Sequence, residues 1–160
     1  MKSPSSHPPP ADDVIRVQVQ TGDFDLGVEA AAIAAQDPGI GGVASFVGLV
    51  RAEPGLISLT LEHYPGMTEK LLKAIADLAS TRFELSGVTI IHRVGTLHPG
   101  DQIVLVVTAA AHRAAALAGT QFLIDWLKTD APFWKQERLE SGSRWIEPKP
   151  QDDEARSRWL

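Results

Sequence analysis

Apolar and polar residues alternate along several short stretches of the chain, a two-residue period typical of half-buried β-strands. Residues 14–20 show it most clearly, with Ile15, Val17 and Val19 on one face and polar side chains on the other. Residues 103–108 are apolar almost throughout, which favours a strand in the middle of a sheet. The strands predicted in this way cover residues 14–20, 41–50, 57–61, 88–94, 103–108, 133–139 and 144–147.

Three other stretches carry apolar residues at the spacing of a helix with one buried face. They are residues 26–36, a stretch capped by Thr68 that includes Leu71 to Ala79, and residues 109–128, which Pro132 cannot continue. We expect Asp25 to cap the first of them. The predicted order is β-α-β-β-α-β-β-α-β-β, with hairpins, which indicates an α+β fold and not a doubly wound parallel sheet.

The length of 160 residues fits one domain with a small appended subdomain. Three consecutive prolines near the start predict a disordered Pro/Ser-rich tail over residues 1–13, followed by the folded domain over 14–150 and a C-terminal tail over 151–160. The start has no apolar signal region, and no apolar run is long enough to span a bilayer. We therefore expect a cytoplasmic protein without a membrane partner.

Composition narrows the possible chemistry. The formal net charge of -5 excludes a whole-molecule basic field for nucleic acid. The chain has no cysteine, which excludes a cysteine nucleophile, a thiolate metal site and a persulfide relay on this chain. The five histidines show no HxH or HxxxH pairing, and no phosphate-binding glycine loop is present. We expect neither a metal nor a cofactor.

Two pairs of basic residues near the third predicted helix are candidates for chemistry. His112 and Arg113 lie at its start, where free N–H groups and the positive dipole end favour a phosphate or carboxylate. The alternative is a surface arginine beside a capping histidine. Lys128 lies at the end of this helix. It is either a reactive amine or a lysine without chemical function, which the negative end of the helix dipole favours at this position. Lys135 follows on a predicted strand.

Lys135 and Glu137 share one face of that strand, and Trp134 and Gln136 share the other. Lys135 is either held by a carboxylate at a pocket wall or is a solvated charge above an aromatic core. Two arginines lie at the ends of predicted strands, and each side chain projects either into a cleft or onto the solvent-exposed surface. They are Arg51 and Arg144.

Taken together, these segments resemble the large, catalytic subunit of molybdopterin synthase, the MoaE family. The resemblance runs in the family's order from about residue 43 to 147. The matching stretches are Phe46-Val47-Gly48-Leu49-Val50-Arg51, Thr60-Leu61-Glu62-His63-Tyr64-Pro65-Gly66-Met67, Ile91-His92-Arg93-Val94-Gly95, Pro99-Gly100-Asp101, Ala111-His112-Arg113, Leu127-Lys128-Thr129, Ala131-Pro132-Phe133-Trp134-Lys135 and Arg144-Trp145.

The resemblance implies an α/β hammerhead-type fold with a small additional antiparallel β subdomain, and a homodimer. Each protomer would bind a small ubiquitin-like sulfur-carrier subunit, giving a heterotetramer. The carrier's C-terminal Gly-Gly thiocarboxylate would enter a pocket and supply sulfur to cyclic pyranopterin monophosphate, forming the dithiolene of molybdopterin. The chain would then be a sulfurtransferase of molybdenum cofactor biosynthesis.

The resemblance also implies roles for individual residues. Lys128 and Lys135 match the two pocket lysines and are the expected catalytic residues. The residues expected to bind the substrate are Leu49, Val50, Arg51, His112, Arg113, Lys128, Lys135, Gln136, Glu137 and Arg144, the last of which matches an arginine that the neighbouring protomer can supply. One departure is visible, because the segment 52–58 after Arg51 is shorter than usual for the family.

Two other classes of function fit the same basic cluster. One is a non-catalytic anion-binding or scaffold protein of the same fold. The other is an enzyme that acts on a different phosphorylated heterocycle, with Phe133 and Trp134 as a stacking platform. Lys128 and Lys135 favour sulfur transfer over these two alternatives, because phosphate binding alone does not need both lysines.

Overall fold

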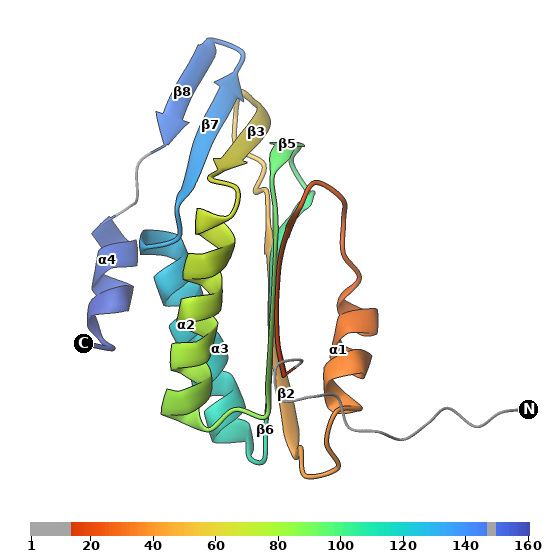
Figure 1. Cartoon of the computed structure of the whole chain (residues 1–160). Helices are drawn as coiled ribbons and strands as arrows, with labels where there is room; N and C mark the ends of the chain where they lie inside the picture. Colours follow the sequence, from red (N-terminus) through yellow and green to blue (C-terminus); the bar gives the residue numbers. More distant parts are fainter. Residues whose placement is uncertain (1–13, 147–149) are drawn as a thin grey trace, which may run out of the picture.

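The computed structural model describes residues 14–146 and 150–160, so the tail predicted over 1–13 lies outside the described residues. Two four-stranded sheets and four helices make up the described part of the chain (Figure 1). In chain order the elements are β1 (Ile15–Gln20), α1 (Leu26–Ala34), β2 (Gly42–Leu49), β3 (Leu56–His63), α2 (Met67–Phe83), β4 (Gly87–Arg93), β5 (Gly95–Leu97), β6 (Gln102–Ala110), α3 (Arg113–Thr129), β7 (Phe133–Leu139), β8 (Gly142–Ile146) and α4 (Pro150–Ser157).

The larger sheet has the strand order β1-β4-β6-β2. β6 lies between β4 and β2 and is antiparallel to both, which confirms the central position predicted from its continuous apolar sequence. β1 is parallel to β4. Helix α1 covers one face of this sheet, and α2 and α3 cover the other (Figure 1). β2 is therefore an edge strand, with β6 as its neighbour in the described structure.

Alternate residues of the central strands supply the two cores of the larger sheet. Val88, Ile90 and Val106 pack with Phe122 and Leu123 of α3 on one face. Ile91, Leu105, Val107 and Ala109 form the other core, together with Ile33 of α1. This arrangement explains why β4 and β6 lack the polar-apolar alternation of a half-exposed strand.

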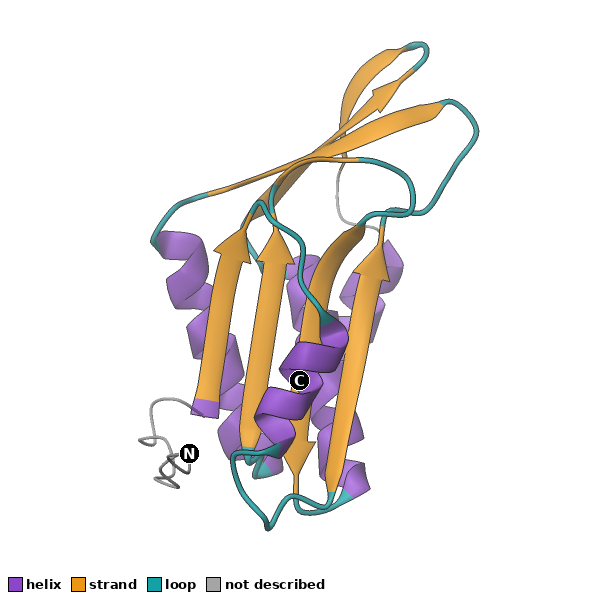
Figure 2. Ribbon diagram, turned by 90° about the vertical axis from the view of Figure 1, so that its right-hand side faces the viewer, coloured by secondary structure: helices purple, strands orange, loops and turns teal. Residues whose placement is uncertain are grey.

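The second sheet has the order β5-β3-β7-β8 and lies across one end of the larger sheet (Figure 2). Its strand pairs are all antiparallel. A separate small core holds it in place, formed by Val50, Leu59, Leu61, Val94 and Leu97. This sheet is the additional antiparallel β subdomain that was expected, and the mixed architecture confirms the α+β prediction.

The third predicted helix begins later than expected. Residues 109–110 belong to β6, and the helix starts at Arg113 with His112 as its N-cap residue. Ala109 pairs with Val43 and Gly87 and is fully buried, so sheet pairing overrides the helical propensity of the alanines.

The turn into α3 also explains a glycine ahead of β2. A Cβ on Gly41 would collide with the carbonyl oxygen of Ala111, and a Cβ on Gly42 would touch the Arg113 backbone. The start of β2 and the start of α3 are therefore packed backbone to backbone.

The second helix differs from the prediction in its cap, and one strand was missed. Gly66, not Thr68, is the N-cap residue of α2, and its N–H donates to Glu69 Oε2 at 2.6 Å. Thr68 is buried inside the first turn, where its hydroxyl accepts from the Tyr64 N–H and donates to the Pro132 carbonyl.

The strand that the sequence pattern did not predict is β5, which has only three residues.

The segment expected as a C-terminal tail forms α4, which packs beside α3 (Figure 1). Trp159 follows this helix and donates from Nε1 to Asp125 Oδ2 at 2.6 Å. Its ring makes edge-on contacts with Phe83 and Phe122. Arg156 forms an ion pair with Asp130 at 2.7 Å.

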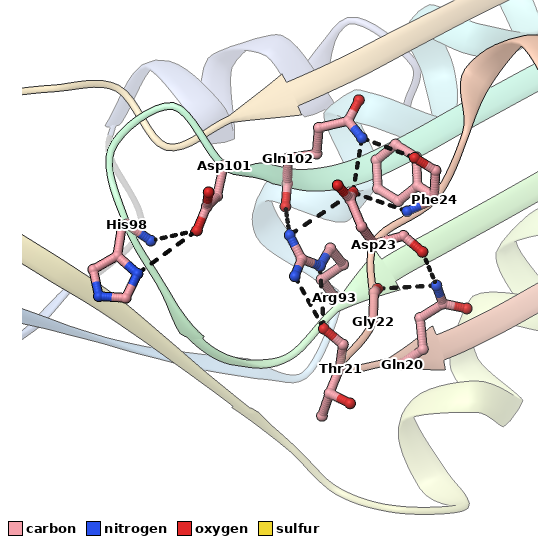
Figure 3. Close-up of polar contacts among 9 residues, drawn as sticks. All are labelled: Gln20, Thr21, Gly22, Asp23, Phe24, Arg93, His98, Asp101 and Gln102. Carbon is pink, nitrogen blue, oxygen red and sulfur yellow. Dashed lines mark hydrogen bonds and ion pairs between the residues drawn. The ribbon is translucent and has the colours of Figure 1, made fainter.

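Arg93, the last residue of β4, ties together the ends of three strands (Figure 3). Its guanidinium donates to the carbonyl oxygens of Thr21 and Gln102, and it lies 3.8 Å from Asp23. The Gln102 side chain donates to the same Asp23 carboxylate at 2.8 Å. This bond, with the Phe24 N–H and the Arg93 charge, holds the pKa of Asp23 below its ordinary value. The cluster fixes the end of β4 on which the candidate site is built.

Candidate functional site

A cavity of about 430 Å³ lies where the end of the larger sheet meets the second sheet. The end of β2, the end of α3 and the inner face of β7 supply most of its walls. The residues that line it are Leu49, Val50, Arg51, Glu53, Leu56, Leu59, His92, Ile103, Leu127, Lys128, Thr129, Ala131, Phe133, Lys135, Glu137, Ile146 and Asp152. Its size is that of a small-molecule site.

The structure brings six of the predicted site residues together at this cavity. They are Leu49, Val50, Arg51, Lys128, Lys135 and Glu137. Lys128 is exposed at the last turn of α3 and makes no hydrogen bond or ion pair with a described residue. Lys135 is half-buried and reaches the cavity from β7. Arg51 leaves the end of β2 and forms an exposed ion pair with Glu53 at 3.0 Å.

Two further predicted residues, Arg144 and Gln136, do not line the cavity. Arg144 of β8 forms a two-atom contact with the Glu137 carboxylate, at 2.8 Å from Nε and 2.7 Å from the terminal nitrogen. Glu137 is thus paired with Arg144 in the structure. Gln136 alternates with Lys135 and Glu137 on β7, so it lies on the opposite face of the second sheet.

His112 and Arg113 lie at the other end of α3. From Arg113 to Lys128 the helix rises about 23 Å, so these side chains cannot reach the cavity of their own chain. Both are exposed, and neither makes a polar side-chain contact with a described residue. The helix start is nevertheless suited to an anion, as the sequence predicted.

The charges of one chain nearly cancel at the cavity. Among the described lining residues, the cations Arg51, Lys128 and Lys135 are matched by three carboxylates. Those are Glu53, Glu137 and Asp152. The strongly cationic pocket predicted from the sequence is therefore incomplete within one chain.

His92 also lines the cavity, although it was predicted only as part of a family-matching stretch and not as a site residue. It is the penultimate residue of β4 and is 6% exposed. Its ring stacks on Phe133, with ring centroids 3.8 Å apart and planes 15° from parallel. Nδ1 lies 2.8 Å from the Arg93 carbonyl oxygen. The stacking partner comes 41 positions later, so no local pattern could reveal this environment.

Burial lowers the pKa of His92 from its ordinary value of 6.5 to about 3. The hydrogen bond to the Arg93 carbonyl opposes this shift, and the charges of Lys135 and Lys128 add to it. His92 is consequently neutral at physiological pH, in the field of two lysine ammonium groups.

The arrangement suits an anionic ligand and the stabilisation of developing negative charge. The described residues contain no cluster of histidine and carboxylate side chains able to hold a metal ion. A sulfur nucleophile for group transfer would have to come from a ligand or partner, because the chain has no cysteine.

Comparison with known proteins matches the chain to one family. The family model described as MoaE protein matches residues 19–130. The chain belongs to the MoaE family. A relative from Ralstonia nicotianae, named molybdopterin synthase catalytic subunit, is 50% identical over 89% of this chain and 83% of its own length. This membership confirms the resemblance and the expected place of the chain among the enzymes of molybdopterin biosynthesis.

Solved structures of the MoaE family share the fold. The molybdopterin cofactor biosynthesis protein E of Burkholderia multivorans is 52% identical, with a TM-score of 0.80 over 91% of this chain and 97% of its own. A complex of subunits 1 and 2 of the molybdopterin-converting factor from Helicobacter pylori superposes with a TM-score of 0.69 at 20% identity, covering 85% of this chain and 92% of that one. The expected hammerhead-type fold is thereby confirmed. The described helices include none that is long and apolar enough to cross a membrane.

Proposed function

We propose that this chain is the sulfur-transferring catalytic subunit of a molybdopterin synthase. It would move sulfur from a thiocarboxylated carrier protein to cyclic pyranopterin monophosphate. The observation that carries the proposal is a cavity with two lysines and an arginine in a MoaE-family chain without a single cysteine. Such a site can bind anions and stabilise charge, but it must receive its sulfur from outside.

The partner that fits this requirement is a small ubiquitin-like carrier ending in Gly-Gly thiocarboxylate. Two glycines have no side chains, so they can enter a narrow cavity beside a second ligand. The Helicobacter pylori neighbour is a complex of two subunits, which supports a partner of this kind. A cytoplasmic location stays a prediction.

Sulfur transfer would take two bond exchanges per sulfur atom. The thiocarboxylate sulfur attacks a substrate carbon, forming a C–S bond as a C–O bond breaks. The displaced oxygen leaves with the bonding electron pair, either on the phosphate group or as hydroxide that is protonated to water. Water then attacks the acyl carbon of the resulting thioester and the acyl C–S bond breaks. The sulfur stays on the substrate as a thiol, and the carrier leaves as a carboxylate with release of a proton. A second carrier repeats both exchanges to complete the dithiolene.

Lys128 is placed to act on the charge that develops during these exchanges. Its ammonium lies at the cavity mouth without a hydrogen bond or ion pair to a described residue, so it is available to a carbonyl oxygen or a leaving oxygen. Lys135 reaches the cavity from β7, and Arg51 offers a guanidinium for phosphate. Leu49, Val50 and the Glu137–Arg144 pair would shape the rest of the substrate site.

A homodimer would complete this site. β2 is an edge strand, and a two-fold axis beside its middle would place the partner's β2 antiparallel to it. The cavity end of β2 at Leu49 would then lie beside the partner's Gly42, whose backbone touches Arg113. Two apolar side chains of this strand are exposed, namely Val43 and Leu49.

This geometry would place His112 and Arg113 of each copy at the cavity of the other. The eight residues of β2 span about 26 Å, close to the 23 Å or so by which α3 separates these residues from Lys128. Their charges would turn the nearly neutral cavity into the cationic pocket that two bound anions need. With one carrier on each protomer, the assembly would be a heterotetramer.

The direct test is an assay for dithiolene with purified chain, thiocarboxylated carrier and pterin precursor. Wild type should form product. Lys128→Ala should lower the rate about 100- to 1,000-fold, the usual effect of removing one group that stabilises an oxyanion. Lys73→Ala, at an exposed position on α2, is the matched control and should leave the rate unchanged. Absence of product with wild type would refute the proposal.

Complementation between variants tests the shared site. Co-expressed Lys128→Ala and Arg113→Ala chains should form mixed dimers in which one of the two sites is intact. Random assembly then restores about one quarter of wild-type activity, although each variant alone is nearly inactive. If Arg113 serves the cavity of its own chain, every site in the mixture lacks one residue and no activity returns.

A further inference from the structure

His92 lines the cavity, but the roles proposed for the lysines and arginines give it no function. A lysine side chain at the cavity can turn toward solvent, whereas both the ring and the backbone of His92 are held in place. Its ring lies flat against Phe133, and β4 fixes its backbone between β1 and β6. The imidazole is therefore held in one orientation at the cavity that it lines.

The hydrogen bond at Nδ1 decides which nitrogen carries the proton. A carbonyl oxygen can only accept, so Nδ1 must donate its hydrogen to the Arg93 carbonyl across 2.8 Å. In the neutral ring Nε2 is then a lone-pair acceptor. No described residue donates a hydrogen bond to this nitrogen. The carbonyl is itself held in place, because the Arg93 side chain is anchored to Thr21 and Gln102 (Figure 3).

His92 Nε2 differs from the ionised side chains around this cavity in being an uncharged acceptor. Arg51, Lys128 and Lys135 are hydrogen-bond donors only. The carboxylates of Glu53 and Glu137 can accept, but they are charged and each is paired with an arginine through one oxygen. His92 Nε2 is uncharged, so it attracts an N–H or O–H group without repelling a neighbouring phosphate. Burial and the two lysine ammonium groups keep it uncharged well below neutral pH.

We propose that His92 Nε2 accepts a hydrogen bond from an N–H or O–H group of the bound pterin, which makes His92 a specificity-determining residue of the site. The inference rests on the proposed function for the identity of the ligand. The cationic groups would hold the phosphate and the carrier terminus, and His92 would read the neutral heterocycle. A phosphorylated compound without a donor at this point would leave the nitrogen unpaired and bind more weakly.

Two substitutions separate the cavity contact from the structural bond. Asn at position 92 can keep the donor to the Arg93 carbonyl through its amide, but it has no acceptor that reaches the Nε2 position. Gln can place its Oε1 close to that position. We expect His92→Asn to raise the KM for the pterin about ten-fold, the effect of one lost hydrogen bond. His92→Gln should stay within about three-fold of wild type, and the KM for the carrier should not change in either variant.

The outcome that overturns the inference is equal behaviour of the Asn and Gln variants, or a parallel change in both KM values. Lack of product with wild type would instead overturn the proposed function, and this inference with it. If a variant fails to fold, wild type with ¹⁵N-labelled histidine supplies the answer. Saturating pterin should shift the resonance of the unprotonated His92 nitrogen toward that of a hydrogen-bonded acceptor, and an unchanged resonance in the saturated complex refutes the contact.

Discussion

The buried neutral state of His92 makes the stability of the fold depend on pH between about 3 and 6.5. The folded protein holds the imidazole unprotonated down to a pKa of about 3, whereas the unfolded chain takes up a proton near the ordinary value of 6.5. The unfolded state therefore binds more protons throughout this window. Stability rises with pH across it, and acidification favours unfolding.

The magnitude follows from these two pKa values. At pH 7 the unfolded histidine is mostly neutral and the cost is about 0.2 kcal/mol. At pH 5 protonation of the unfolded chain favours unfolding by about 2 kcal/mol. The ring is 6% exposed, so solvent screening reduces this value little. Asp23 and Glu69 have pKa values below their ordinary ones, so they also favour unfolding on acidification. Both are unchanged in a variant that replaces His92, so their contribution cancels when wild type is compared with that variant.

Denaturant unfolding at pH 7 and pH 5 measures this effect, with His92→Phe as the reference. Phenylalanine keeps an aromatic ring against Phe133 but cannot take up a proton. All other groups titrate alike in both proteins, so wild type should lose about 2 kcal/mol more than the variant on going from pH 7 to pH 5. The same loss in both proteins would show that His92 is not held neutral by burial, and would refute the reasoning.

Two further changes test the packing that positions the site. Gly41→Ala should lower the free energy of unfolding by about 1–3 kcal/mol, since its Cβ would push the Ala111 carbonyl away from the start of α3; Gly22→Ala, which has open space around it, should change little in the same denaturant titration. Trp159→Phe should cost about 1–3 kcal/mol, because it removes the donor from the buried Asp125 carboxylate. The exposed control is Leu160→Ala. Equal melting temperatures of Trp159→Phe and this control would contradict the hydrogen bond from Trp159 to Asp125.

Signals that lie close together along the chain were enough to predict much of the fold. Asp25 caps α1 through a bond to the Val28 N–H at 3.0 Å, a contact between residues three positions apart. The apolar run of β6 identified a central strand, because burial on both faces leaves a direct trace in composition. The family motifs placed the two lysines at what the structure shows to be one cavity.

The errors arose where distant residues decide the local structure. Ala109 lies in a strand against helical propensity, because β2 and β4 pair with it from either side. Thr68 has the chemistry of a cap, but its hydroxyl is committed to Tyr64 and to the distant Pro132 carbonyl. The state of His92 depends on a ring from another sheet, which no window of neighbouring residues contains.

The second sheet rests on a much smaller core than the first, formed among the described residues by five buried side chains: Val50, Leu59, Leu61, Val94 and Leu97. Since sub-global opening starts where buried apolar contacts are few, the main-chain amides of β7 and β8 should exchange with deuterium before those of β4 and β6. Such an opening removes one wall of the cavity while the larger sheet stays folded. A ligand that bridges both sheets would slow this exchange, so the occupied site would itself become a structural tie between them.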